Sequence, residues 1–590
     1  MIGVGTGLSA VEGIKASSQQ LLGALPDEVA GPADKFTNDS GVLLKFHGIY
    51  QQDDRDVRSE RARQGLGVFS MCMVRTAIPG GVLDAGQYLA LDALCDAVGN
   101  GTLRVTTRQG LQYHFVAKAD LRPLLATLNR HLVTSLGACG DVVRNTMCCP
   151  APLADRAASG VQEVAAEIAR RFRPRTSAYY QLWMDGERAV SAPVPVPVPA
   201  DEPLYGASYL PRKFKMGIAF PGDNCIDLYT HDVGLLPVLN AAGRAAAFTV
   251  VVGGGMGKSH TDPTTYPRLA DPLTTVAADE LMDVLEAVVL VQRDHGNRAD
   301  RDHARLKYLV AGWGVDRFRA RVGEQLGRLL PAAEPVVLQD ADDHLGWHEQ
   351  DDGRWFLGVK VENGRIADRA DGVRVRSALR AVVESFSPGV RFTPREDVLL
   401  TDVAAGDRGA LDSVLADHGV VPASSWVPIK RNSFACPALP TCGLALTESE
   451  RALPGVLDEL HAELGDLGLG DLDAHVRMTG CPNGCARPYT AEIGLVGRGK
   501  RNYDIHLGGE PVGIRLNSIF AENVPRPELV NVLRPVLAHY GERRRPDEGL
   551  GDFCHRVGVA TLRAELGNES WVRRRAAAPD LVAEVAEVMG

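Results

Sequence analysis

The chain has no hydrophobic run long enough to cross a membrane. Of its 590 residues, 45% are hydrophobic and 23% are charged, a composition typical of a folded globular protein. The longest apolar runs, residues 245–252 and 288–291, fall far short of the ~20 residues that span a bilayer. The N-terminus also lacks a charged segment followed by a long apolar stretch. We therefore expect a cytoplasmic protein without a targeting peptide or a membrane partner.

The chain also lacks a positive net charge and a regular array of cysteines. Its net charge of −10 argues against a nucleic-acid partner, because phosphate binding requires clustered lysine and arginine. Eleven cysteines, an odd number unevenly spread, argue against a secreted disulfide framework and for reduced thiols. We interpret seven of them as buried small hydrophobic residues: Cys72, Cys95, Cys139, Cys148, Cys149, Cys225 and Cys554.

The other four cysteines form two close pairs near the C-terminal end. Cys436 and Cys442 flank the sequence Pro-Ala-Leu-Pro-Thr, and Cys481 and Cys485 flank Pro-Asn-Gly. Two such pairs, about forty residues apart, can bring four thiolates to one centre, as an iron–sulfur cluster requires. Zinc is the first alternative, although structural zinc usually draws its cysteines from shorter knuckles. A disulfide pairing is the second.

The residues around these cysteines resemble those of sulfite reductase hemoproteins, members of the siroheme and [4Fe-4S] nitrite/sulfite reductase family. The resemblance runs from about Val11 to Val559 and includes both cysteine motifs and four further segments: 45–56, 101–109, 210–215 and 252–256. It implies a [4Fe-4S] cluster held by four thiolates: Cys436, Cys442, Cys481 and Cys485. It also implies that Cys485 contacts the siroheme iron on its proximal side.

A faint internal repeat indicates how the chain is organised. Residues 104–115 and 391–400 both read as a strand, a polar loop and a second strand. A hairpin candidate precedes each copy, at 78–82 and at 361–365, where Asn-Gly is a strong turn signal. The sequence therefore predicts two related halves.

Further periodicity sets the fold class. Period-2 alternation supports strands at 102–105 and 356–361, and helical periodicity covers 160–172 and 278–291. This mixture predicts an α/β (α+β) class. The resemblance implies two siroheme-reductase repeats, each a half ferredoxin-like unit plus a larger mixed α/β domain. The expected domains are an N-terminal extension that wraps the core (1–66), the first half ferredoxin-like unit (67–140), the first α/β domain (141–334), the second half ferredoxin-like unit (335–408) and the second α/β domain with the cluster cysteines (409–590).

The resemblance implies the six-electron reduction of sulfite to sulfide. This reaction requires a cationic pocket for a small dianion and protons for the departing oxygens. By resemblance, four residues bind the substrate: Arg75, Arg144, Lys213 and Lys215. Strand alternation in 212–215 places both lysines on one face, with Arg212 and Phe214 on the other; a solvated edge strand with outward lysines is the alternative. Arginine suits bidentate binding of sulfite oxygens, and lysine can deliver protons.

Siroheme carries eight carboxylates, so its binding site should be basic and rich in hydrogen-bond donors. By resemblance, the contacts come from Arg104, Thr106, Thr107, Arg108, Gln109, Gln112, His114, Arg212, Gly253, Gly254, Gly255, Lys307 and Asn483. An isolated histidine such as His114 is more often a hydrogen-bonded core residue, and three glycines are also typical of a tight turn.

The second repeat departs from the family pattern. It has Arg395-Glu396-Asp397 where relatives usually carry an Asn-Gln-Asn type of loop. The two acids would repel a siroheme carboxylate unless Arg395 compensates.

The electron donor has to be another protein, because no dinucleotide or flavin fingerprint is recognisable. Segments 312–315, 345–350 and 485–489 look more like ferredoxin-dependent members, whereas 50–56 looks more like members served by an NADPH flavoprotein. We expect ferredoxin. Two basic runs, Arg543 to Arg545 and Arg573 to Arg575, are interpreted as solvated faces that could also dock an acidic donor.

Two other functions remain open from the residues. A siroheme nitrite reductase would use the same cofactors, and the lysine-bearing segment 210–215 favours sulfite over nitrite. An iron–sulfur scaffold without siroheme would not need two arginines and two lysines in one pocket.

Overall fold

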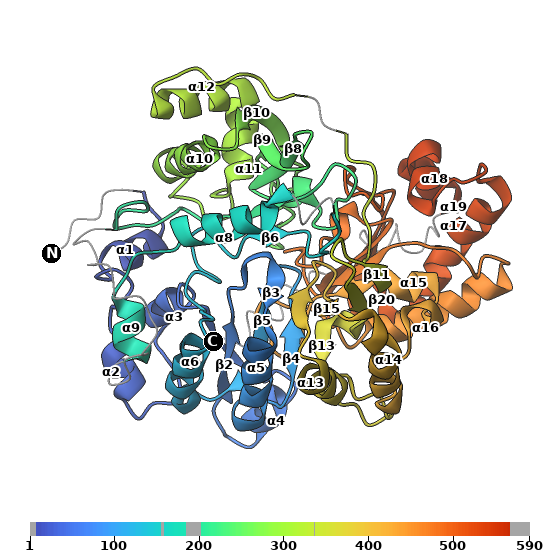
Figure 1. Ribbon diagram of the computed structural model, residues 1–590, viewed down its shortest axis with the longest axis horizontal. Helices are drawn as coiled ribbons and strands as arrows, with labels where there is room; N and C mark the ends of the chain where they lie inside the picture. The colour runs from blue at the N-terminus through green and yellow to red at the C-terminus, as the bar shows by residue number, and fades with distance from the viewer. Residues whose placement is uncertain (1–6, 155–158, 185–201, 335–336, 567–590) are drawn as a thin grey trace. The chain divides into compact units, whose positions relative to one another are not determined.

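The computed structural model describes residues 7–154, 159–184, 202–334 and 337–566. The chain divides into two compact units. Unit 1 comprises the chain up to Val427 together with 440–443 and 512–514, and unit 2 comprises 428–439, 444–511 and the chain from Arg515 onward. Each unit mixes strands with helices (Figure 1), which confirms the predicted α/β class.

Unit 1 contains three five-stranded sheets. The order in the first is β1 (Ile49–Asp53), β2 (Ser70–Arg75), β5 (Leu111–Val116), β4 (Leu103–Val105) and β13 (Arg365–Ile366). The order in the second is β11 (Gly346–Glu349), β12 (Trp355–Val359), β15 (Val398–Val403), β14 (Gly389–Phe392) and β3 (Val82–Leu83). The order in the third is β10 (Asp271–Ala277), β9 (Ala245–Val252), β8 (Val233–Leu239), β7 (Met216–Ile218) and β6 (Met147–Cys148). Both copies of the strand–loop–strand repeat are present, as β4–β5 and β14–β15.

The two predicted hairpins are wrong, because each turn sends its chain into the other sheet. The 3-10 turn η1 (Pro79–Gly81) leads into β3, which pairs with β14. The turn η4 (Glu362–Gly364) leads into β13, which pairs with β4. Each turn ends on a glycine in the left-handed region, and a Cβ there would lie 2.5 Å from a backbone oxygen of the other half: that of Phe392 for Gly81 and of Val105 for Gly364. The turn signals were correct, but the pairing was not local.

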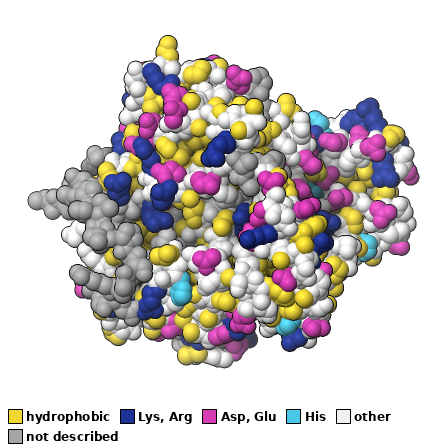
Figure 2. Space-filling model, in the orientation of Figure 1, with side chains coloured by type: hydrophobic (Ala, Val, Ile, Leu, Met, Phe, Trp, Pro, Cys, Tyr) yellow, Lys and Arg dark blue, Asp and Glu magenta, His cyan; other side chains and the backbone are white. Residues whose placement is uncertain are grey.

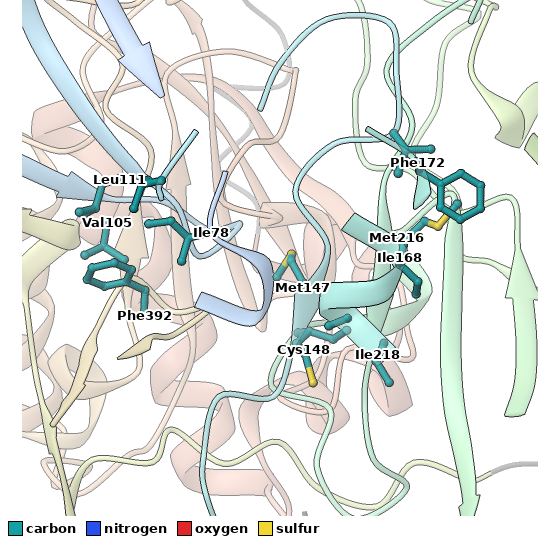
Figure 3. Close-up of a cluster of buried hydrophobic side chains, with 14 of the residues drawn as sticks. Ile78, Val105, Leu111, Met147, Cys148, Ile168, Phe172, Met216, Ile218 and Phe392 are labelled. Carbon is teal, nitrogen blue, oxygen red and sulfur yellow. The ribbon is translucent and has the colours of Figure 1, made fainter. Parts of the chain in front are cut away.

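The strand exchange gives the first two sheets a shared core. Figure 3 shows Phe392 of β14 beside Val105 and Leu111 of the first sheet, with Ile78 close by, and all four side chains are buried. Burying apolar surface stabilises a fold by roughly 25 cal/mol per Å². Because the two sheets bury these side chains against each other, we expect the free energy of unfolding of each half to fall when the other half is removed.

The helices of unit 1 cover these sheets. They are α1 (Ala10–Ala16), α2 (Leu25–Ala30), α3 (Asn38–Leu44), α4 (Arg58–Arg63), α5 (Ala85–Ala97), α6 (Leu121–Arg130), α8 (Val161–Arg171), α9 (Ala178–Trp183), α10 (Leu281–His295), α11 (Leu306–Trp313), α12 (Val315–Leu326), α13 (Val375–Phe386) and α14 (Arg408–Asp417). The predicted helices at 160–172 and 278–291 are confirmed as α8 and α10. Helix α5 begins with a capping box, in which Asp84 accepts from the Gln87 amide at 2.7 Å and Gln87 accepts from the Asp84 amide at 3.1 Å. It pairs with α13 through the buried Asp92, which binds Arg376 and Arg380.

Unit 2 contains one sheet of order β16 (Phe434–Ala435), β17 (Val476–Thr479), β18 (Ile493–Gly499), β19 (Asn502–Leu507) and β20 (Ser518–Pro525). Its first three strands are parallel and its last two antiparallel, and β6 to β10 of unit 1 repeat this pattern. The helices are α15 (Pro428–Arg431), α16 (Leu453–Asp466), α17 (Leu529–Arg543), α18 (Leu550–Val557) and α19 (Val559–Leu566). The repeat therefore extends to the larger α/β parts.

The surface shows charges of both signs. In Figure 2, acidic and basic side chains are interspersed over the visible face. Arg543 to Arg545 are exposed at the end of α17, whereas Arg573 to Arg575 lie outside the described residues. Within the described ranges, no helix combines the length and the apolar character needed to span a bilayer.

Candidate cofactor and substrate site

The cysteine motifs of unit 2 stand at the ends of two neighbouring parallel strands. Cys436 follows β16 and is buried, and Cys481 follows β17 after one residue and is also buried, whereas Cys485 is exposed. The Gly480 amide donates to Cys436 Sγ at 3.4 Å, and the Asn483 side-chain amide donates to Cys481 Sγ at 3.5 Å. N–H groups aimed at sulfur stabilise thiolates, which are the form that ligates iron.

Close packing fixes the loop between these cysteines. A Cβ on Gly480 would lie 2.5 Å from both Ala438 Cβ and the Thr447 oxygen, so only glycine fits there. The Tyr489 hydroxyl donates to the Pro482 oxygen at 2.9 Å and so anchors the other side of the loop. The packing of unit 2 therefore holds the loop that carries Cys481 and Cys485.

Cys442 belongs to unit 1, through segment 440–443. Arg55 binds this segment: its amide donates to the Pro440 oxygen at 3.3 Å and its Nη1 donates to the Cys442 oxygen at 3.2 Å. Arg55 lies in the segment 45–56 that carries the family resemblance, yet sequence reasoning assigned it no role. The convergence of all four thiolates stays a prediction.

The two predicted substrate arginines lie in unit 1 around Tyr50 and Cys139. Arg75 Nη1 lies 3.2 Å from Cys139 Sγ, and its guanidinium carbon lies 6.0 Å from the centre of the Tyr50 ring. With its amide oxygen turned toward Arg75, Gln112 accepts from Arg75 Nη2 at 2.6 Å. Burial raises the pKa of the Tyr50 phenol, against the charges of Arg144 and Arg75. Two guanidinium groups thus flank one neutral phenol.

More cations surround the buried Asp141. Arg301 Nη2 lies 2.9 Å from Asp141 Oδ2, and Lys15 Nζ lies 3.6 Å from the same oxygen. Burial lowers the pKa of both Lys45 and Arg212, and the charges of neighbouring arginines lower them further. The excess of cations over carboxylates favours an added anion. Sequence reasoning missed Lys45, Asp141 and Arg301, although Lys45 opens a segment of family resemblance.

Lys213 and Lys215 lie in an extended segment just before β7, not within the strand as predicted. The expected alternation is present in part: Phe214 is buried while both lysines are partly exposed, but Arg212, predicted on the side of Phe214, is partly exposed as well. The Phe214 amide donates to the Val142 oxygen at 3.0 Å, and the Arg144 amide donates to the Phe214 oxygen at 2.9 Å. These two bonds place the lysine segment directly beside the Arg144 segment.

Several residues predicted to contact siroheme are engaged within the protein. Gln109 donates to the oxygens of Gly80, Cys148 and Phe392 at 3.1, 2.8 and 2.9 Å. Thr106 Oγ1 accepts from the Gly110 amide at 3.1 Å and so shapes the β4–β5 loop. Thr107 is half-buried in the same loop. Gln109 and Thr106 therefore position the loop, whatever else they bind.

The backbone amides of the glycine segment are bonded to other parts of the chain. The amides of Gly253, Gly254 and Gly255 donate to the oxygens of Asp232, His231 and Arg268 at 2.9, 2.9 and 2.8 Å. Lys307 is fully buried beside this glycine segment, where it donates to the oxygens of Gly255, Gly257 and Tyr266. Burial, reinforced by Arg305, lowers the pKa of Lys307 to about 6. Because all three glycine amides already donate to backbone oxygens, they are not available to a carboxylate, and the segment is bonded to neighbouring segments rather than folded as a tight turn.

The charged side chains of the second-repeat loop have partners within the protein. Arg395 Nη2 donates to the Ala341 oxygen at 2.5 Å. Glu396 binds Arg104 Nη2 at 2.7 Å, and both side chains are buried. Asp397 lies 3.4 Å from Lys360 Nζ and accepts from the Val361 amide at 2.9 Å. The correction is that Arg104 of the first repeat, a predicted siroheme contact, neutralises Glu396.

His114 tests whether the residues of the first repeat fit siroheme. It is 2% exposed, and neither ring nitrogen has a hydrogen-bond partner among the described residues. Burial, reinforced by Arg365, Arg104 and Arg75, lowers the pKa of His114 well below its usual value. A neutral ring must still donate from one nitrogen, and leaving it unpaired costs about 1–3 kcal/mol. A carboxylate bound there would accept a hydrogen bond from the His114 ring and would neutralise part of the positive charge of the nearby arginines. The residues therefore fit siroheme, which carries carboxylates.

Comparisons with known proteins agree with this geometry. The family model described as the nitrite and sulphite reductase 4Fe-4S domain matches residues 139–330 and 427–574. The model described as the nitrite/sulfite reductase ferredoxin-like half domain matches 67–131 and 348–418.

Individual relatives match along nearly the whole chain. A sulfite reductase [ferredoxin] of Synechococcus elongatus is 43% identical over 94% of this chain and 90% of its own. A sulfite reductase [NADPH] hemoprotein beta-component of Staphylococcus saprophyticus is 40% identical over 94% of this chain and 96% of its own. The structure of Mycobacterium tuberculosis NirA shares the fold, with a TM-score of 0.73 and 24% identity over 94% of this chain and 97% of that one. The chain therefore belongs to the nitrite and sulfite reductase family.

Proposed function

We propose that this chain is an assimilatory sulfite reductase that reduces sulfite to sulfide with siroheme and a [4Fe-4S] cluster. The observation that carries the proposal is the 43% identity to a curated sulfite reductase over 94% of the chain. That match includes both repeats, the two cysteine motifs and the lysine-bearing segment.

Four thiolates are proposed to hold the cluster, those of Cys436, Cys442, Cys481 and Cys485. The N–H···S contacts at Cys436 and Cys481 support this assignment, and the exposed Cys485 suits a second ligand role at siroheme. His114 is proposed to donate to a siroheme carboxylate, with Arg108, Gln112, Arg212 and Asn483 as further contacts. When bound, the cofactor pair would pass six electrons, one at a time, from the electron donor to sulfite. The protein supplies charge, donors and protons.

The proposed substrate pocket combines Arg75, Arg144, Lys213 and Lys215. Each guanidinium can offer two parallel N–H donors to an oxyanion, which orients sulfite and neutralises its charge. A lysine ammonium can give a proton to a departing oxygen and regain one from water, because its partly exposed side chain keeps contact with solvent. The backbone bond between Phe214 and Arg144 holds the two kinds of cation in register.

The proposed electron donor is ferredoxin, with an NADPH flavoprotein as the alternative. Both donors occur in the names of relatives with similar identity. Steady-state assays with each reduced donor separate them: ferredoxin should give the higher kcat/KM, and a higher value with the flavoprotein would reverse the choice.

The function itself is tested with purified, anaerobic protein. We expect siroheme, four irons per cluster and sulfide production, with a higher kcat/KM for sulfite than for nitrite under one donor. A reversed ratio would make the chain a nitrite reductase. Protein that carries a cluster but no siroheme would instead support the scaffold alternative.

A further inference from the structure

A second set of metal-ligating side chains lies inside unit 1. Cys149, Asp223, Cys225 and His344 are all buried, and one ligand atom from each lies within 4.8 Å of the other three. Sequence reasoning interpreted the two cysteines as small hydrophobic residues. They are buried, but they face a carboxylate and an imidazole.

The spacing matches a single tetrahedral ion. Cys149 Sγ lies 3.1 Å from Asp223 Oδ2 and 3.5 Å from His344 Nε2, and these last two atoms are 3.1 Å apart. With metal–sulfur bonds of about 2.3 Å and metal–nitrogen or –oxygen bonds of about 2.0–2.2 Å, tetrahedral ligands lie roughly 3.3–3.8 Å from one another. Cys149, Asp223 and His344 need to move only by tenths of an ångström to accept an ion, and the Cys225 sulfur lies within 4.8 Å of their ligand atoms.

The surroundings aim the ligand atoms inward. Asp223 Oδ1 accepts from the amides of Cys225 and Asp342 at 3.0 and 3.1 Å, which leaves Oδ2 toward the other three ligands. His344 points Nε2 at the site, while its Nδ1 lies 3.6 Å from the Asp342 carboxylate. At 3.6 Å the two groups are not hydrogen-bonded, and Nδ1 has no hydrogen-bond partner among the described residues. A small approach of the carboxylate would give the pairing that usually supports a metal-binding imidazole.

The internal repeat supplies an independent observation. Cys149 follows β6 directly, as Cys436 follows β16. Cys225 lies eight residues before β8 begins at Val233, and Cys485 lies eight residues before β18 begins at Ile493. Two residues after each of these cysteines the backbone is left-handed, with φ of 52° at Asp227 and 54° at Arg487. The cysteines of unit 1 thus occupy the loop positions that carry cluster cysteines in unit 2.

We propose that Cys149, Asp223, Cys225 and His344 bind one structural zinc ion. Two thiolates with one imidazole and one carboxylate suit zinc, and four protein ligands leave no open position, as in structural sites. The ion would join three separate segments: the end of β6, the loop before β8 and the chain that enters β11. It would thereby tie the first α/β part to the start of the second half ferredoxin-like unit.

The wild-type holoenzyme provides the first test. Cells are grown with both iron and zinc, the protein is purified anaerobically, and both metals are counted per chain. We expect one zinc per chain besides the iron, and a zinc-edge X-ray absorption spectrum with two sulfurs at about 2.3 Å and two nitrogen or oxygen neighbours at about 2.0–2.2 Å. Absence of zinc, zinc without sulfur neighbours, or a Cys149–Cys225 disulfide in peptide mass spectra would overturn the proposal.

Variants then locate the ion. Cys149→Ala and Cys225→Ala should each lower zinc content at least tenfold, and the buried but distant Cys95→Ala should leave it unchanged. If a variant fails to fold, the spectrum of the wild type still decides. Retention of zinc in both folded variants would contradict the assignment.

Discussion

The β4–β5 and β14–β15 loops are copies of one strand–loop–strand unit, yet their buried polar side chains differ in their partners. At matching positions stand Gln109 and Glu396, both with left-handed backbone, and five residues later stand His114 and Thr401. In the second copy, Glu396 Oε1 binds Arg104 at 2.7 Å, and Thr401 donates to Asp402 at 2.7 Å. In the first copy, His114 has no partner among the described residues.

The exchanged strands explain how one copy can support the other. β13 pairs with β4, and a Cβ on Gly364 would lie 2.9 Å from Glu396 Cβ, so the second loop packs against the first. We propose that the second copy is structural and that the first faces siroheme. The duplication thus allows the β4–β5 unit to keep a buried polar side chain, His114, without a protein partner among the described residues, because the β14–β15 unit stabilises the shared core.

The largest expected effect comes from removing the two lysine cations of the first repeat that are proposed to bind sulfite. Lys213→Met and Lys215→Met should each lower sulfite turnover by about 10²-fold or more, because proton delivery and charge neutralisation are both lost. Siroheme and iron content should stay near the wild-type level. The exposed Lys500→Met is the matched control. Normal turnover in both lysine variants would return the segment to the solvated interpretation.

The next largest effect is expected from breaking the buried ion pair between Glu396 of the β14–β15 loop and Arg104. Glu396→Gln leaves Arg104 buried without its carboxylate, so we expect a loss of about 3–5 kcal/mol in the free energy of unfolding. Thermal melts of the purified variants measure it, with the exposed Glu384→Gln as control. Siroheme per folded chain should not change. A variant as stable as the wild type, but depleted in siroheme, would assign the second loop to cofactor binding.

A smaller effect is expected from a buried carboxylate whose partners differ between the two α/β parts. Before β8, Asp232 binds Arg305 at 2.7 Å, whereas at the matching position before β18 the buried Glu492 accepts only from the amides of Gly551 and His475 in the bonds that the structure shows. Burial raises the pKa of Glu492 to about 7, from 4.5. Between these values the acid ionises only in the unfolded chain, so stability falls as pH rises and levels off above about 7.

Glu492→Gln removes this pH dependence. The melting temperature of the wild type minus that of the variant should decrease by a few degrees, roughly, between pH 5 and pH 8. Glu384→Gln should show no such trend. A difference that stays constant between pH 5 and pH 8 would mean that Glu492 is already ionised in the folded protein.

Local patterns predicted the elements well and the long-range pairing poorly. Alternation located β4 and β12, and helical periodicity located α8 and α10, because these signals arise within a few residues. The turns at 78–82 and 361–365 were recognised, but a turn does not specify which strand its chain joins.

The candidate site shows the same limit. The cysteine motifs stand out because their spacing carries chemistry. The pairing of Arg104 with Glu396 joins residues 292 positions apart, and the set around Cys149 draws its histidine from 195 positions away. No local pattern encodes such contacts, so sequence reasoning missed both.

The siroheme content of His114→Phe tests the division between the two loops most directly. The variant replaces the imidazole by a somewhat larger apolar ring and so removes both nitrogens, and Thr401→Val removes the polar group at the matching position of the second copy. Extracted siroheme per folded chain should fall several-fold in His114→Phe and stay at the wild-type level in Thr401→Val. Equal siroheme content in both variants, with normal folding, would contradict the claim that the first loop faces the cofactor.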